Sequence, residues 1–73
     1  MATEIKYKNT AEVLIHAYRN FPPNTKFRSL FGATDVVSET DSVRVDKFGD
    51  CYILCKSGEY RLIYNGSYWA EIL

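Results

Sequence analysis

The chain has 73 residues, of which 47% are hydrophobic and 15% aromatic, and its nine basic residues balance nine acidic ones. This composition excludes a disordered chain and indicates one small globular domain. The balanced charge argues against a highly acidic mimic of DNA and against a strongly basic nucleic-acid binder, because affinity for phosphate depends on clustered lysine and arginine.

The sequence also bears on the compartment. Residues 1–8 lack the apolar stretch of a signal peptide, and no run approaches the roughly 18 apolar residues of a membrane span. We therefore expect a cytoplasmic protein with no membrane association. Cys51 and Cys55 lie four residues apart in one predicted strand, with their Cα atoms about 13 Å apart, which is too far for a disulfide between them. We expect both to be small core residues of a reducing compartment.

The first element that the sequence predicts clearly is an amphipathic helix from Ala11 to Phe21. Residues 2–8 before it alternate weakly and are compatible with an edge strand or a loose arm. Asn9 is suited to cap the helix, and Glu12 follows three residues later, as in a capping box. Pro22 and Pro23 end the helix, because proline lacks the amide donor. At about 100° per residue, the polar arc holds Glu12, His16, Arg19 and Asn20, and the apolar arc holds Ala11, Val13, Leu14, Ile15, Ala17, Tyr18 and Phe21.

The middle of the chain is less regular. Asn24 and Thr25 form a predicted turn, and residues 26–31 alternate as a short strand would. Gly32 interrupts that pattern. Residues 33–41 are polar apart from Val36 and Val37, so we expect a loop with at most one short strand there.

Residues 42–73 predict an antiparallel meander of four strands joined by three tight turns. The turns are Gly49-Asp50, Ser57-Gly58 and Asn65-Gly66, of which Asn-Gly is a strong signal for a two-residue hairpin loop. The predicted strands are Ser42–Phe48, Cys51–Lys56, Glu59–Tyr64 and Ser67–Leu73.

Two-residue turns determine the register of this meander. They place Leu62 opposite Trp69, Ile53 opposite Leu62, and Val45 opposite Leu54. Both faces of the resulting sheet are then apolar, whereas a sheet with one solvated face alternates apolar and polar residues. The predicted class is therefore α+β, with the helix packed on a four- to five-stranded antiparallel sheet, either open or curled into a small half-barrel.

Two interpretations of the apolar faces remain open. In one, the sheet curls so that one face lines the interior and the helix covers the other. In the second, the helix covers one face only, and an aromatic patch is left for a second protein or a second copy of the chain. The anchors of that patch are Tyr60, Leu62, Tyr64 and Trp69, and Arg44 and Glu71 orient the partner from its edge.

The sequence contains no motif for catalysis, a metal or a cofactor. His16 is the one histidine, and it falls on the polar arc of the helix, which is typical of a surface position. The strand holds Cys51 and Cys55 too far apart to share one zinc ion without other ligands. An alternative to a protein-binding role is that bases of nucleic acid, or of a small nucleotide, stack on Tyr60, Tyr64 and Trp69 beside Arg44 and Lys56.

Two stretches resemble a known group of proteins. The run from Tyr60 to Ile72 (YRLIYNGSYWAEI) and the run from Phe21 to Ser29 (FPPNTKFRS) are similar to parts of small bacteriophage accessory proteins, most of which have no assigned role. The hairpin spacing before Trp69 is one residue longer in this chain than in those phage proteins. The resemblance implies a phage-encoded protein of the host cytoplasm that binds and inhibits a host protein. It assigns a role to no individual residue.

Overall fold

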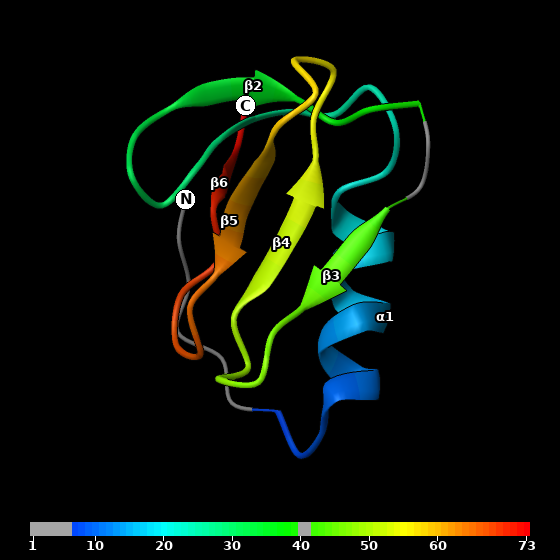
Figure 1. Cartoon of the computed structure of the whole chain (residues 1–73), viewed down its shortest axis with the longest axis vertical. Coiled ribbons are helices and arrows are strands. Elements are labelled where there is room, and N and C mark those ends of the chain that lie inside the picture. The colour runs from blue at the N-terminus through cyan, green and yellow to red at the C-terminus, as the bar shows by residue number, and fades with distance from the viewer. Residues whose placement is uncertain (1–6, 40–41) are drawn as a thin grey trace.

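A computed structural model describes residues 7–39 and 42–73 (Figure 1). This part of the chain contains one helix and two antiparallel sheets of three strands, so the predicted α+β class is confirmed. The sheets have the strand orders β2-β1-β6 and β3-β4-β5. The elements are α1 (Thr10–Asn20), β1 (Lys26–Arg28), β2 (Thr34–Val36), β3 (Val43–Val45), β4 (Cys51–Leu54), β5 (Tyr60–Tyr64) and β6 (Glu71–Ile72).

Helix α1 begins and ends close to the predicted residues. The side chain of Asn9 accepts a hydrogen bond from the Glu12 amide at 3.1 Å, as an N-cap should. The Glu12 carboxylate accepts from the Lys8 amide at 2.9 Å. At the other end, the Phe21 amide donates to the Ala17 carbonyl, and Pro22 follows. Local side chains therefore determine both ends of the helix.

The buried stripe of α1 is narrower than predicted. Val13 and Ala17 are buried on it, and Phe21 continues the same line into the core. Ile15 and Tyr18, which the helical projection placed with these residues, are exposed instead. The helix lies behind β3 (Figure 1) and contacts both β3 and β4 through this narrow stripe.

The first predicted hairpin register is wrong, because the loop between β3 and β4 is longer than two residues. The Asp46 carboxylate accepts hydrogen bonds from the amides of Phe48 and Asp50, which closes a wider turn. Val45 consequently pairs with Cys51 and not with Leu54. This shift of three residues reverses the face of β3 relative to β4, since side chains alternate along a strand.

The second predicted register is also wrong. Ile53 pairs with Arg61 rather than with Leu62, and a bulge interrupts the β4–β5 ladder. Tyr52 pairs with Leu62 while Cys51 pairs with Tyr64, so β5 contains one extra residue, Ile63, at this point. A bulge of this kind turns the side chain that follows it to the opposite face of the sheet.

The last predicted strand does not complete the meander. Strand β6 pairs with β1, through Phe27 opposite Ile72 and Arg28 opposite Glu71. The Asn65 side chain accepts from the amides of Ser67 and Tyr68 and widens the Asn-Gly turn. Trp69 therefore forms an isolated bridge with Tyr64 rather than pairing with Leu62.

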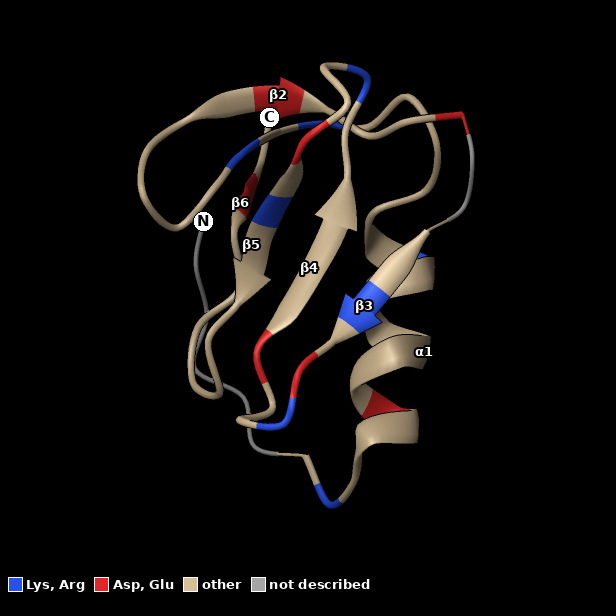
Figure 2. Ribbon diagram, in the orientation of Figure 1, with Lys and Arg blue, Asp and Glu red and all other residues tan. Residues whose placement is uncertain are grey.

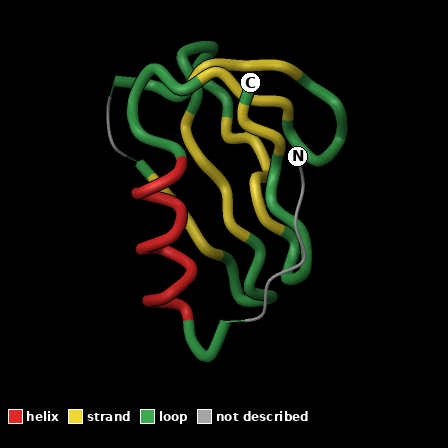
Figure 3. Tube along the Cα trace, turned by 180° about the vertical axis from the view of Figure 1, so that it is seen from behind, coloured by secondary structure: helices red, strands yellow, loops and turns green. Residues whose placement is uncertain are grey.

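The two sheets enclose one core, and pairings connect them at two places. Val37 bridges to Cys55, and Trp69 bridges to Tyr64. Figure 3 shows the back of the molecule, where the strands wrap around the interior beside the helix. The core consists of Val13, Ala17, Phe21, Phe27, Val37, Cys51, Ile53, Cys55, Ile63, Tyr64, Trp69 and Ala70.

Two expectations for the N-terminal half have separate outcomes. The predicted strand at residues 26–31 is present but short, since β1 comprises Lys26–Arg28. The alternatives for the N-terminal segment fall mainly on residues 1–6, which lie outside the described residues. No helix in the described part of the chain is long and apolar enough to cross a membrane.

Candidate functional site

The structure divides the predicted aromatic patch between the core and the surface. Tyr64 and Trp69 are buried, with only 4% and 3% of their surface exposed. The expectation that they form surface anchors is therefore wrong for this conformation. The bulge at Ile63 explains why Tyr64 is buried, because it turns the Tyr64 side chain to the face that carries Cys51.

Tyr60 and Leu62 precede the bulge and keep the orientation expected for a surface. Tyr60 pairs with Leu54, Leu62 pairs with Tyr52, and Tyr52 pairs in turn with Arg44. Paired residues share a face of the sheet. We call these five residues the outer aromatic face: Arg44, Tyr52, Leu54, Tyr60 and Leu62.

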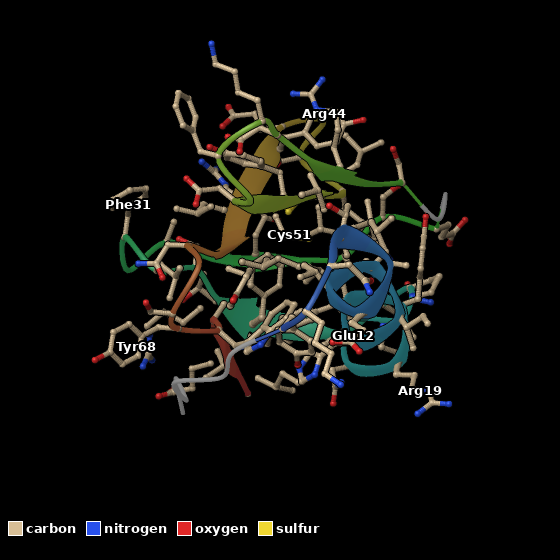
Figure 4. The ribbon with its side chains drawn as sticks, turned by 90° about the horizontal axis from the view of Figure 1, so that it is seen from below. Glu12, Arg19, Phe31, Arg44, Cys51 and Tyr68 are labelled. Carbon is tan, nitrogen blue, oxygen red and sulfur yellow. The ribbon has the colours of Figure 1, made fainter. Side chains whose placement is uncertain are left out.

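Polar contacts order the edge of the outer aromatic face. The Arg44 guanidinium lies over the Tyr60 ring, 4.4 Å from its centroid. The hydroxyls of Tyr60 and Ser42 are hydrogen-bonded at 2.9 Å. Tyr60 is 37% exposed, and Arg44 projects away from the core (Figure 4). An aromatic ring held beside a cation, as here, is already arranged for contact with a partner.

Glu71 does not join this face. It lies in β6, on the other sheet, where its carboxylate forms an ion pair with Arg28 at 2.9 Å. The pairing of β6 with β1 accounts for this position. The expectation that Glu71 orients a partner at the same surface as Arg44 is therefore wrong.

A second constellation, which the sequence did not predict, surrounds Trp69. The His16 ring stacks on the indole with centroids 4.1 Å apart, and the Tyr64 ring stacks at 4.5 Å. Tyr7 meets the indole edge-on at 6.1 Å, and its hydroxyl is hydrogen-bonded to His16 Nδ1 at 2.5 Å. His16 is half-buried rather than a plain surface residue.

One sequence signal pointed toward this role of His16. The residue borders the buried stripe, being three residues after Val13 and next to Ala17. The polar character of histidine placed it on the solvent side in the helical projection. Burial lowers the pKa of His16 below its usual value of 6.5. The imidazole is therefore neutral at pH 7, and a neutral imidazole ring packs well against the indole.

An open pocket of about 310 Å³ borders this cluster. It lies along α1 and is lined by Tyr7, Glu12, Ile15, His16, Arg19 and Asn20. Its walls combine an aromatic ring, an aliphatic side chain and several polar groups. A small-molecule site needs an apolar wall and polar groups that orient the ligand, and this pocket offers both.

The cysteines are structural. Both are free and buried, and burial raises the pKa of the Cys51 thiol to about 12 and that of Cys55 to about 11. A thiol with so high a pKa is a poor nucleophile and a poor metal ligand at neutral pH. Within residues 7–39 and 42–73 there is no group of three or more histidine, cysteine or acidic side chains that could hold a metal ion.

Charge is distributed rather than concentrated. Figure 2 shows basic and acidic residues interspersed over the strands and loops of the described chain. Arg44 belongs to the outer aromatic face, and Asp46 and Lys47 follow directly after β3. Comparisons with protein-family models, with curated proteins and with solved structures found no match.

Proposed function

We propose that this protein is a non-enzymatic binding protein and that the outer aromatic face is its contact surface. The observation that carries the proposal is a sheet face of aromatic and aliphatic side chains over which no described helix or strand lies (Figures 1 and 4). Tyrosine and arginine are the residues that most often supply binding energy at interfaces.

The composition of this face supports a protein partner. Tyr52, Leu54 and Leu62 are half-buried, so a partner can remove further apolar surface from water. Arg44 is held over Tyr60, and this reduces the conformational entropy lost when both are immobilised. A complementary partner surface presents an apolar patch next to an acidic group that faces Arg44.

The partner that we propose is a protein of a bacterial host. The stretches Phe21–Ser29 and Tyr60–Ile72 resemble small phage accessory proteins, and such a protein would act in the host cytoplasm as an inhibitor or modulator. A second copy of the chain is the other occupant of the same face.

The bridges Val37–Cys55 and Trp69–Tyr64 also support the finer expectation that the strands close into a small barrel-like fold.

A second candidate is a nucleic-acid or small-nucleotide binder. The observation that favours it is the exposed Tyr60 ring beside Arg44, since a base stacks on such a ring next to a cation. Trp69 and Tyr64 are enclosed and cannot contribute stacking surface here. The scattered charge also weakens this alternative, so we rank it second.

Cross-linked pull-down from the host, followed by binding measurements with the purified partner, tests the proposal. Tyr60→Ser and Arg44→Ser should each weaken binding by about tenfold or more, the loss typical of interface anchors. Tyr68→Ser is the matched control, because Tyr68 is a tyrosine of similar exposure, 47%, in the loop before β6. It should leave binding unchanged.

Other outcomes separate the alternatives. Equal binding by the Tyr60→Ser and Tyr68→Ser variants would contradict the proposed surface. If light scattering shows that the wild type is a dimer and that Tyr60→Ser is a monomer, the occupant of this face is a second copy of the chain and not a host protein. Salt-sensitive binding of oligonucleotides or cyclic dinucleotides that requires Arg44 would favour the second candidate.

A further inference from the structure

The pocket along α1 is separate from the outer aromatic face. Figure 4 shows Glu12 and Arg19 on the side of the molecule away from Arg44. The pocket is formed by residues of α1 together with Tyr7, and it has a volume of about 310 Å³. A ligand bound there would leave the outer aromatic face free. The inference below is therefore independent of the proposed partner.

Hydrogen bonds behind the pocket determine which side-chain groups act as donors toward it. The Trp69 indole N–H is buried and makes no hydrogen bond of good geometry with the described residues. A phenol O–H is a stronger donor than the N–H of a neutral imidazole, so the Tyr7 O–H donates to His16 Nδ1.

This arrangement assigns the tautomer of His16. When Nδ1 of a neutral imidazole accepts a hydrogen bond, Nε2 carries the proton. His16 lines the pocket, and Nε2 is the ring nitrogen left for a ligand once Nδ1 is bonded to Tyr7. His16 therefore offers an N–H donor toward the open side of the cluster.

Two further donors, three and four residues after His16, share its face of α1. The Asn20 amide uses one N–H to bond the His16 carbonyl at 2.8 Å, which leaves its second N–H available. Arg19 also lines the pocket, and its side chain is exposed near the end of α1 (Figure 4). The one acidic group of the lining, Glu12, lies two helical turns before Arg19 and already accepts from the Lys8 amide.

We propose that this pocket binds an organic carboxylate, with its two oxygens at Arg19, His16 and Asn20 and its apolar body against Ile15 and Tyr7. A guanidinium fork and neighbouring N–H donors match the two acceptor oxygens of a carboxylate. Ile15 and the Tyr7 ring supply an apolar wall. Glu12, at the far end, disfavours a second negative charge, so the ligand is a monoanion.

Benzoate is a suitable probe because it joins a carboxylate to a small apolar ring, and benzamide is its uncharged counterpart. His16 is the one histidine of the chain, so its ring proton resonances report on the pocket without ambiguity. We expect saturable shifts with benzoate, a dissociation constant in the millimolar range, and binding of benzamide that is about tenfold weaker. Bound benzoate should also raise the pKa of His16, since a nearby anion favours the imidazolium.

Arg19→Gln removes the charged donor from an exposed position without disturbing the core. It should weaken the binding of benzoate about tenfold. Arg44→Gln changes the same charge on the opposite side of the molecule and should have no effect. Equal shifts with benzoate and benzamide, or equal affinities of the two variants, would overturn the proposal. So would benzoate shifts that rise linearly without saturation. A free carboxylate metabolite and the C-terminus of a peptide share this chemistry, and a short peptide compared with its C-terminal amide distinguishes them.

Discussion

Trp69 is enclosed by four other rings, namely those of Tyr7, His16, Phe21 and Tyr64. Each aromatic pair contributes about 0.5–1.5 kcal/mol beyond the burial of its area. The indole N–H without a good partner costs about 1–3 kcal/mol in the opposite direction. The ring contacts outweigh this cost.

His16 makes this cluster sensitive to pH. Burial lowers its pKa from the usual 6.5, so the folded protein favours the neutral imidazole more than the unfolded chain does. The unfolded chain therefore takes up a proton at higher pH, and the stabilisation that is complete above about pH 7.5 is lost as the pH falls through the His16 titration. We expect the urea midpoint to decrease between about pH 7.5 and pH 5.5.

The groups that face His16 do not reverse this expectation. Tyr7 is uncharged throughout the range, because burial raises its pKa. His16→Gln is the control, because glutamine does not titrate. A midpoint that falls equally in the wild type and in this variant would show that another group is responsible.

At the scale of elements, Asp35 connects the two sheets. From β2 its carboxylate accepts from Ser57 Oγ at 2.9 Å and from Arg61 Nε of β5 at 3.4 Å, and it also accepts from the Val36 amide. Burial acts to raise the pKa of Asp35, but these donors together hold it below its usual value of 3.8. The ionised carboxylate therefore stabilises the fold, and this contribution is lost as the pH falls through the depressed pKa.

Asp35→Asn should lower the free energy of unfolding by about 1–2 kcal/mol, because it weakens several hydrogen bonds of a mostly covered group. Glu59→Gln is the matched control. Glu59 also pairs with Arg61, at a shorter distance of 3.0 Å, but its side chain is 65% exposed. Water screens such a pair, so Glu59→Gln should lower the free energy of unfolding by less than about 0.5 kcal/mol. Urea unfolding of both variants at neutral pH measures the difference, and equal losses would contradict the role assigned to Asp35.

At the scale of the whole molecule, a domain of 73 residues depends on few core side chains. Phe27 and Phe31 illustrate this, since they are four residues apart but have opposite environments. Phe27 is fully buried and meets Phe21 edge-on at 5.7 Å, whereas Phe31 is 85% exposed in the loop after β1 (Figure 4).

Phe27→Ala should lower the free energy of unfolding by about 3–5 kcal/mol, which is the typical effect of truncating a large aromatic residue in a core. Total stability for such a domain is about 5–15 kcal/mol, so this variant should be largely or wholly unfolded at elevated temperature. Phe31→Ala should change stability by less than about 0.5 kcal/mol. Thermal and urea unfolding followed by circular dichroism compares the two, and a small loss in Phe27→Ala would contradict the single-core description.

Local sequence signals were sufficient for the helix and for the position of most strands. The Asn9 cap and Pro22 act within one helical turn, and β-branched and aromatic runs indicated β3, β4 and β5. The aromatic surface was only half predicted. Tyr60 and Leu62 lie on the outer aromatic face, but Tyr64 turns inward after an unpredicted bulge.

The sequence by itself therefore determined the α+β class, the ends of α1 and the burial of the two cysteines, because each depends on neighbours in the chain or on the apolar character of one segment. Only the tertiary structure decided which strands pair, in what register, and which aromatic residues reach the surface. The reason is that side-chain bonds of Asp46 and Asn65 widen the turns, and β6 pairs with β1 of the other sheet. A register shift of one residue exchanges core for surface along a whole strand, and no local signal specifies it.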